Sequence, residues 1–309
     1  MTSDFGHRPV LLEATVAGLE PVNGGRYLDG TLGGGGHSAA LLDAAGPDGI
    51  VVGIDRDPAA LAAARARLKP FGDRFTALHG TFDQMAALAA DWAPFDGILL
   101  DLGVSSPQLD KPERGFSFQS DGPVDMRMDP TQDLDATQLL AGLDERGLAE
   151  ILRRYGEEPR ARRIARAILE GRPWESTLSL ARCIADASGY RNSRTHPATR
   201  TFQALRIAVN DELGQLERAI AIAVGMLRPN GRLAIITFHS LEDRLVKRTF
   251  RILSGHGTAK DPYGNPVIAP KYRLVHRRGI AGKDADAGHP RSRSARLRIL
   301  EHLPAESPL

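Results

Sequence analysis

Four consecutive glycines, residues 33–36, stand between an apolar segment that ends in an acid and a helix-like segment. Glycine allows backbone turns with positive φ and lets a ligand approach the main chain closely. The helix that follows would offer unpaired N–H groups and the positive end of its dipole. A second acid, Asp55, ends the next apolar segment, at the distance expected for a carboxylate that binds a ribose. This spacing predicts a site for a nucleotide-like cofactor at the edge of a parallel sheet.

The acid before the glycines, Asp29, narrows the class of cofactor. Class I S-adenosylmethionine methyltransferases carry an acid here, in a pattern of the type Asp-x-Gly-x-Gly-x-Gly, and the chain resembles it with Thr31 in place of the first glycine. A dinucleotide oxidoreductase is the rival, because Ser38 or Ala39 would supply the small residue that its helix–strand contact needs. A glycine turn without a ligand is disfavoured, because the position of Asp55 would then be a coincidence.

A third acid, Asp101, ends the fourth apolar segment of the chain. Amino-group methyltransferases of class I place a polar residue here, followed by Pro-Pro and an aromatic residue, and the polar atoms hold the target amine. The chain keeps the acid but lacks that continuation, so Phe116 or Phe118 would have to stack on a base, unless both pack in a core. We predict that Asp101, Ser105 and Ser106 position the amine and accept its hydrogen bond. The two serines would serve equally well as caps of a turn.

Composition sets bounds on the class of protein. The formal net charge is only +2, so the chain is no highly basic nucleic-acid coat, although local basic patches are compatible with it. The single cysteine, Cys183, excludes an internal disulfide and a cysteine-cluster metal site, and we predict no bound metal. No apolar signal core and no run of membrane-spanning length is present, so a cytoplasmic protein without membrane contact is expected.

The first third of the chain alternates between strand-like and helix-like segments, which predicts a parallel sheet. Strands are expected at 26–30, 50–55, 75–79 and 97–102, and helices at 37–45, 58–68 and 82–89. The second of these helices has Asp57 as its expected N-cap, with a proline at its first position.

From about residue 110 to residue 209 the strand signal is absent. The periodicity predicts helices over 139–155, 159–170 and 179–187. The alternation then resumes, with predicted helices at 212–226 and 240–253, a turn at 229–231, and strands at 232–238, 272–276 and 295–302. Ser240 and Asp243 resemble a capping box, and 283–294 is expected to be a flexible loop.

Arginine is concentrated over 153–172, 191–206 and 271–298, and no acid occurs between residues 187 and 210. A run of charge is usually a solvated face, but the second run also carries groups that suit phosphate. We predict RNA contacts from this run, with Arg194, His196, Arg200 and Arg206 as the contacting residues. Arg206 would alternatively pair with an internal carboxylate and support its helix.

The predicted fold class is therefore α/β, a class I S-adenosylmethionine methyltransferase (Rossmann-like) sheet with an inserted α-helical domain. Residues 1–109 and 210–309 would form the discontinuous methyltransferase domain. Residues 110–209 would form the insert, with a role in RNA recognition.

The blocks DLGVSSPQLD, DGPVDMRMDP, HPATRTFQALRIAVNDEL and FHSLEDRLVKR give the chain a specific resemblance. In this order they resemble the signature blocks of the ribosomal RNA small-subunit methyltransferase H family, and the similarity spans nearly the whole chain. The resemblance implies methylation of N4 of a cytidine in the decoding region of 16S rRNA, with S-adenosylmethionine as cofactor. The implied partner is 16S rRNA within the small ribosomal subunit, and the sequence leaves a homodimer open.

The same resemblance implies a set of cofactor contacts, namely Gly34, Gly35, Gly36, His37, Asp55, Phe82, Asp101 and Gln108. Asp55 would accept hydrogen bonds from the ribose hydroxyls, and Phe82 would offer an apolar surface to the adenine. Asp101 would meet either the amino-acid part of the cofactor or the target amine. Two further rivals stay open: a small-molecule methyltransferase, and a ribosome-assembly factor that keeps the fold without turnover.

Overall fold

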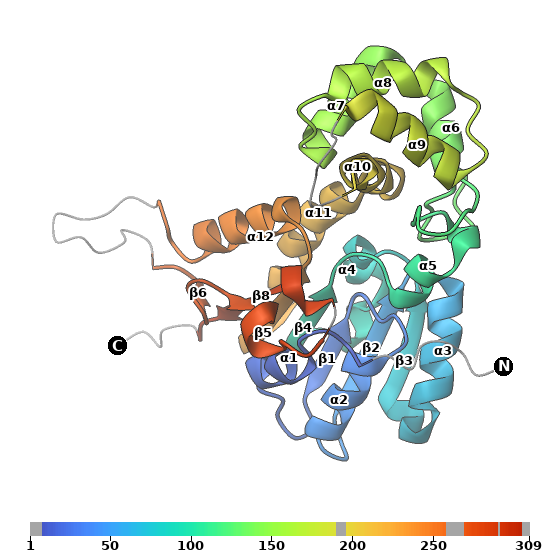
Figure 1. Ribbon diagram of the computed structural model, residues 1–309. Helices are drawn as coiled ribbons and strands as arrows, with labels where there is room; N and C mark the ends of the chain where they lie inside the picture. The colour runs from blue at the N-terminus through green and yellow to red at the C-terminus, as the bar shows by residue number, and fades with distance from the viewer. Residues whose placement is uncertain (1–7, 190–195, 258–268, 290, 305–309) are drawn as a thin grey trace. The chain divides into compact units, whose positions relative to one another are not determined.

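The computed structural model describes residues 8–189, 196–257, 269–289 and 291–304 (Figure 1). The chain divides into two compact units. The first comprises Met1–Gly103 together with Gly214–Leu309, and the second is Val104–Leu213. The second unit extends a few residues beyond the insert predicted for 110–209, at both ends.

A central sheet organises the first unit. Among the described residues it has eight strands, in the order β3-β2-β1-β4-β5-β8-β6, with β7 paired to β8. The strands β3, β2, β1, β4 and β5 pair in parallel, whereas β8 is antiparallel to its neighbours. Their bounds are β1 (Arg26–Asp29), β2 (Ile50–Asp55), β3 (Phe75–His79), β4 (Phe95–Asp101), β5 (Leu227–Thr237), β6 (Tyr272–Leu274), β7 (Ile280–Ala281) and β8 (Arg296–His302). The predicted α/β fold class is confirmed.

The strand order places three acids at one edge of this sheet. β1 lies between β2 and β4, so the chain order reverses there, and ligands of open α/β sheets bind at such a point. Asp29 ends β1 level with Gly53 and Leu99. Asp55 and Asp101 end their own strands two residues further along. All three carboxylates therefore stand at the carboxyl ends of adjacent parallel strands.

The helices of the first unit follow from local capping and from apolar faces that pack against the sheet. They are α1 (Leu12–Leu19), α2 (Gly36–Ala44), α3 (Pro58–Leu68), α4 (Met85–Leu88), most of α11 (Glu212–Gly225), α12 (Ser240–Leu253) and α13 (Gly282–Ala285). Asp57 caps α3 as predicted, because its side chain accepts the N–H of Ala59 at 3.0 Å. Gly35 precedes α2 with φ of +76°, a conformation that favours glycine. Leu41 and Leu42 of α2 and Leu68 of α3 are fully buried.

Among its described residues, the second unit has helices and loops but no strand. Its helices are α5 (Ser106–Asp110), α6 (Ala136–Gly142), α7 (Glu145–Gly156), α8 (Ala161–Glu170), α9 (Thr177–Ser188) and α10 (Ala198–Asn210). Each longer helix buries one apolar face in a common core that includes Leu152, Ile164, Ile184 and Leu205. Phe116 and Phe118 belong to this packing. Core packing, the alternative to base stacking, is therefore what the structure shows for both phenylalanines.

Four local predictions are corrected by the structure. The single helix predicted over 139–155 is two helices, because Asp144 accepts the N–H of Gly147 and starts α7. The turn predicted at 229–231 lies inside β5, where the register against β4 shifts and Asn230 has φ of +66°. The cap of α12 is His239 with Glu242, one residue earlier than predicted. The expected flexible loop 283–294 instead holds buried Asp286 and Ser292, and the Oγ of Ser292 donates to the backbone oxygen of Asp286 at 2.6 Å.

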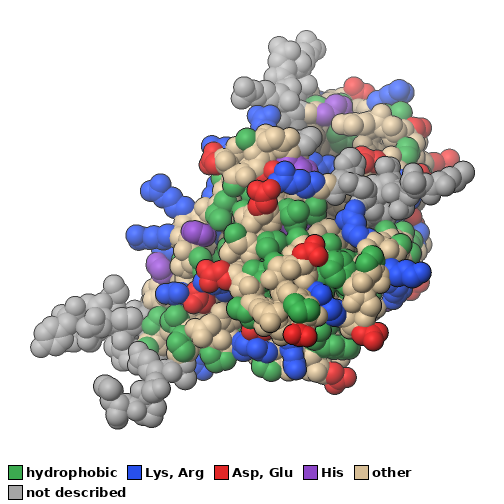
Figure 2. Space-filling view, turned by 90° about the horizontal axis from the view of Figure 1, so that it is seen from below, with side chains coloured by type: hydrophobic (Ala, Val, Ile, Leu, Met, Phe, Trp, Pro, Cys, Tyr) green, Lys and Arg blue, Asp and Glu red, His purple; other side chains and the backbone are tan. Residues whose placement is uncertain are grey.

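Charge of both signs is mixed over the surface. Figure 2 shows one face on which Lys and Arg side chains alternate with Asp and Glu side chains rather than gathering into one patch. This agrees with the formal net charge of +2.

Within the described residues, no helix has the length and apolar character needed to cross a membrane.

Candidate active site

Asp55 connects the loop after β1 with the start of α3. Its Oδ2 accepts the N–H of Gly33 at 2.7 Å, and its Oδ1 accepts the N–H of Asp57 at 2.8 Å. Burial raises the pKa of Asp55 to about 6, although these two N–H groups act in the opposite direction. Each carboxylate oxygen has a further lone pair. The residue can therefore hold the glycine loop in place and still accept a hydrogen bond from a ligand hydroxyl.

Asp29 and Thr31 fix the glycine loop to its neighbours, and neither was predicted as a site residue. Asp29 is 1% exposed, accepts the hydroxyl of Ser38 at 2.7 Å and the N–H of Thr31 at 3.2 Å, and has a pKa raised by burial. The hydroxyl oxygen of Thr31 accepts the N–H of Asp101 at 2.6 Å. Thr31, which replaces a motif glycine, thus fixes the end of β4 to the glycine loop. That replacement was the signal available in the sequence.

His37 and Asp101 meet between the start of α2 and the end of β4. His37 Nε2 lies 3.4 Å from Asp101 Oδ2, and the imidazole is almost fully buried. Among the described residues, neither ring nitrogen of His37 nor Oδ1 of Asp101 has a hydrogen-bond partner, although all three atoms are buried. An unsatisfied buried polar atom costs about 1–3 kcal/mol. Three such atoms together indicate a ligand with polar groups of its own.

The predicted cofactor fits this arrangement. The carboxylate of Asp101 suits an ammonium or amine donor, and Asp55 suits a ribose hydroxyl. Phe82 is half-buried and packs against the core of the first unit, and its role as a surface for the adenine stays a prediction. Gly34 and Gly35 lie in the loop between β1 and α2, and Gly36 begins α2. These residues lie at the carboxyl ends of β1, β2, β3 and β4 or in the segments that follow, and their contacts with the cofactor stay predictions.

The predicted contacts of the second unit have a local structural role. Ser105 caps α5, since its Oγ accepts the N–H of Gln108 at 3.4 Å. The side-chain oxygen of Gln108 in turn accepts the N–H of Ser105 at 3.0 Å. Ser106 is the first residue of that helix. The capping alternative is therefore realised for Ser105, and the catalytic role of the two serines and the cofactor role of Gln108 stay predictions.

The predicted RNA contacts lie at the start of α10 and along it. His196 is exposed, its Nδ1 accepts the N–H of Ala198 at 3.2 Å, and its ring centroid lies 4.6 Å from that of Phe118. Arg200 is exposed and donates to the backbone oxygen of Glu157 at 3.3 Å. Arg194 lies outside the described residues. Arg206 has a carboxylate partner in its own unit, as the alternative prediction states.

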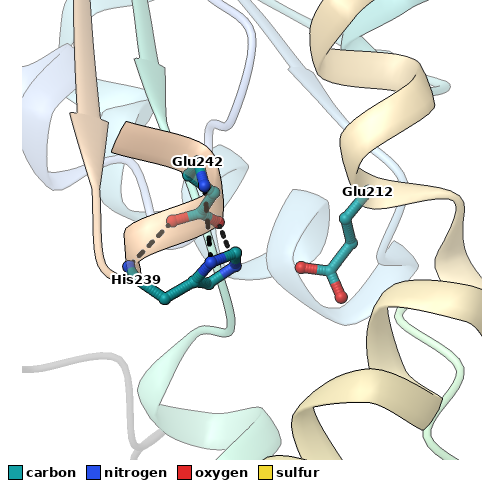
Figure 3. A group of neighbouring side chains, drawn as sticks. All are labelled: Glu212, His239 and Glu242. Carbon is teal, nitrogen blue, oxygen red and sulfur yellow. Dashed lines mark hydrogen bonds and ion pairs between the residues drawn. The ribbon is translucent and has the colours of Figure 1, made fainter. Parts of the chain in front are cut away.

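Three titratable side chains with the composition of a metal site are drawn in Figure 3, and each has partners within its own unit. His239 Nε2 lies 3.1 Å from Glu242 Oε1, and Glu242 Oε2 accepts the N–H groups of Phe238 and His239. Glu212 is held by Arg206, whose Nε and Nη2 donate to its two oxygens at 2.8 Å each. These contacts cap α12 and join α10 to α11.

Comparison with known proteins gives the chain its family. The MraW methylase family matches residues 4–303. The protein named ribosomal RNA small subunit methyltransferase H of Geobacter sulfurreducens is 49% identical over 309 residues, covering 97% of this chain and 99% of the relative. Its namesake from Thermomicrobium roseum is 49% identical over 307 residues, covering 96% and 94%. Solved structures are more distant. An rRNA methylase from Streptococcus thermophilus has 11% identity and a TM-score of 0.42, covering 98% of this chain and 99% of that chain.

The family and the site agree on the chemistry. A methylase with a parallel sheet, a glycine-rich loop after β1 and an acid at the end of β2 has the binding site of a nucleoside-containing methyl donor. The chain therefore belongs to the MraW methylase family, and its cofactor is S-adenosylmethionine.

Proposed function

We propose that the protein methylates the N4 amino group of a cytidine in the decoding region of 16S rRNA, acting in the cytoplasm on the small ribosomal subunit. The observation that carries this proposal is the 49% identity, over 97% of the chain, to a protein named ribosomal RNA small subunit methyltransferase H. The unsatisfied carboxylate oxygen of Asp101 supports an amine as the acceptor group. The choice of N4 of cytidine rests on the resemblance of the signature blocks.

The chain's own residues have a limited chemical task in this reaction. The cofactor supplies a methyl group on a positively charged sulfur, which is its own leaving group. The cytosine amine is a poor nucleophile, because its lone pair is delocalised into the ring. Asp101 would accept a hydrogen bond from the amine and so favour a localised lone pair on nitrogen. Thr31 fixes the backbone N–H of Asp101, and His37 Nε2 lies 3.4 Å from the carboxylate itself, which limits the orientations open to it.

Nucleoside mass spectrometry of 16S rRNA tests the proposal. RNA from cells with the gene should contain N4-methylated cytidine at the decoding region, and RNA from cells without the gene should lack that methyl group. Restoring the gene should restore the signal, and restoring an Asp101→Asn variant should not. An unchanged methylation pattern after deletion would refute the proposal. Methyl transfer to a metabolite but not to RNA would favour the small-molecule alternative.

Arg200→Ala is expected to weaken RNA binding without changing the affinity for the cofactor. Arg200 is exposed, and among the described residues it forms one long hydrogen bond, to a carbonyl oxygen, so its charge is available to a phosphate. Loss of one phosphate contact should lower the slope of log affinity against log salt by about 0.7–0.9. Filter binding at several salt concentrations measures this slope. Arg200→Lys is the matched control and should keep most of it.

Arg206→Ala is expected to give a different result, because Arg206 and the buried Glu212 form a bidentate ion pair. Removing one partner leaves the other charge buried and unpaired, which should destabilise the fold by about 3 kcal/mol. The melting temperature should fall, and RNA affinity should fall only with the folded fraction. A stable variant with a reduced salt slope would instead show that Arg206 contacts phosphate.

A further inference from the structure

An arginine-lined groove runs between α7 and α8 on the second unit. Its volume is about 650 Å³, and its lining residues are Glu145, Arg146, Ala149, Glu150, Arg153, Arg162 and Arg166. The groove follows from the sequence of the two helices. α7 turns Leu148, Ala149 and Leu152 inward, and α8 turns Ile164 and Ile168 inward. The charged residues between these positions are left on the outer faces.

The acids of the groove are already neutralised. Arg166 donates to both oxygens of Glu145, at 3.1 and 3.3 Å, and lowers its pKa. Arg153 pairs with Glu150 one turn away on α7, at 2.5 Å. The first pair joins α8 to α7, and the second lies along α7, so together they order the walls of the groove. They leave its remaining positive charge to the other two arginines.

Arg146 and Arg162 carry that remaining charge. Both are exposed, and neither forms a hydrogen bond or an ion pair with any residue that the structure describes, although the charge of Arg162 helps Arg166 to lower the pKa of Glu145. Two unpaired guanidinium groups on opposite walls of one groove make a surface complementary to a chain of negative charges. Guanidinium presents a planar set of donors that matches phosphate oxygens.

We propose that the α7–α8 groove binds the phosphate backbone of the substrate RNA, with Arg146 and Arg162 as the contacting residues. This inference rests on the proposed function, because it assumes an RNA substrate, and it adds a binding surface separate from the α10 residues. Such contacts position the RNA and do not read its sequence. The groove would therefore add affinity for structured RNA while leaving the choice of the methylated base to the active site.

The experiment compares two single-site variants and their combination with a matched control. Arg146→Gln and Arg162→Gln remove the two unpaired charges and leave both ion pairs intact. Arg163→Gln is the control, since Arg163 is exposed, adjacent to Arg162 and outside the groove. Affinity for protein-free 16S rRNA and for small ribosomal subunits that lack the methylation is measured from 0.05 to 0.5 M KCl, together with cofactor affinity and methylation rate at saturating RNA.

The double variant should bind RNA about 15-fold more weakly at 0.15 M salt, roughly 4-fold for each lost contact, and its salt slope should fall by about 1.4. The control should match the wild-type protein, and cofactor affinity and saturated rate should be unchanged. A wild-type salt slope in the double variant would overturn the proposal. So would weaker binding to intact subunits with wild-type binding to free RNA, because that result would assign the groove to a ribosomal protein. The wild-type protein separates these failures from failure of the proposed function. If the variants overturn the groove proposal but the wild-type protein methylates RNA, the proposed function stands. If the wild-type protein neither binds nor methylates RNA, the proposed function fails as well.

Discussion

Asp101→Asn is expected to lower the rate of methyl transfer by about 100-fold or more, the lower end of what a positioned proton acceptor contributes. Asparagine has nearly the same shape, so the bond from the backbone N–H to the Thr31 hydroxyl should persist. The substitution removes the charge of a carboxylate whose Oδ1 is buried without a hydrogen-bond partner among the described residues. Single-turnover kinetics with labelled cofactor at saturating RNA measures the effect.

The stability of this variant separates a catalytic role from a structural one. Because a buried unsatisfied carboxylate destabilises the folded state, its replacement should leave the melting temperature unchanged or raise it. A rate within about threefold of wild type would contradict the role of Asp101 in the transfer. Loss of activity together with loss of folding would point to a structural role.

Asp55→Ala is expected to weaken the binding of S-adenosylmethionine by roughly 1–3 kcal/mol, the value of one or two hydrogen bonds to a charged group. Part of the loss should come from the glycine loop, because the carboxylate also accepts the N–H of Gly33. Titration calorimetry measures the affinity. Asp57→Ser is the matched control, because serine keeps the N-cap of α3 and should leave the affinity unchanged. Unchanged affinity in Asp55→Ala would contradict the ribose assignment.

The pH dependence of cofactor binding follows from the same residue. Burial raises the pKa of Asp55 to about 6, and the carboxylate is the better acceptor for a ribose hydroxyl. Affinity should therefore rise with pH up to about 7 and then level off, and Asp55→Asn should abolish this dependence. The stability of the cofactor-free protein should change with pH in the opposite direction. Because the pKa of Asp55 is higher in the folded state than in the unfolded state, the folded state binds the proton more tightly. The contribution of Asp55 to the free energy of unfolding is therefore complete below pH 3.8 and is lost as pH rises through about 6.

Most of the sheet could be predicted because its segments carry local signals. β2 ends at Asp55 and α3 begins after Asp57, as the apolar run and the Asp-Pro pair indicate. The irregular part of β5 could not be predicted in this way. Pro-Asn-Gly is a turn signal, and Asn230 keeps a left-handed backbone in the unpaired stretch between Leu227 and Arg232. Pairing of these two flanking residues with β4 extends the strand across the turn, and no local signal indicates that pairing.

The candidate site was predictable in its residues and not in its internal bonds. The acids at strand ends were visible as a pattern, since each follows an apolar run. The bond between Thr31 and the N–H of Asp101 joins residues 70 positions apart, and the replacement of a motif glycine by Thr31 signals an unusual residue without indicating its partner. The pairing of Arg206 with Glu212 likewise depends on the bend at Asp211, where φ is +48°. The sequence could therefore offer two roles for Arg206 and no means of choosing between them.

The most direct test of the account is transfer of a labelled methyl group by the purified protein to small ribosomal subunits that lack the modification. Label from S-adenosylmethionine should appear on N4 of one cytidine of the decoding region in 16S rRNA, and Asp101→Asn should abolish it. Label on another position, or no transfer by a folded protein that binds the cofactor, would contradict the account.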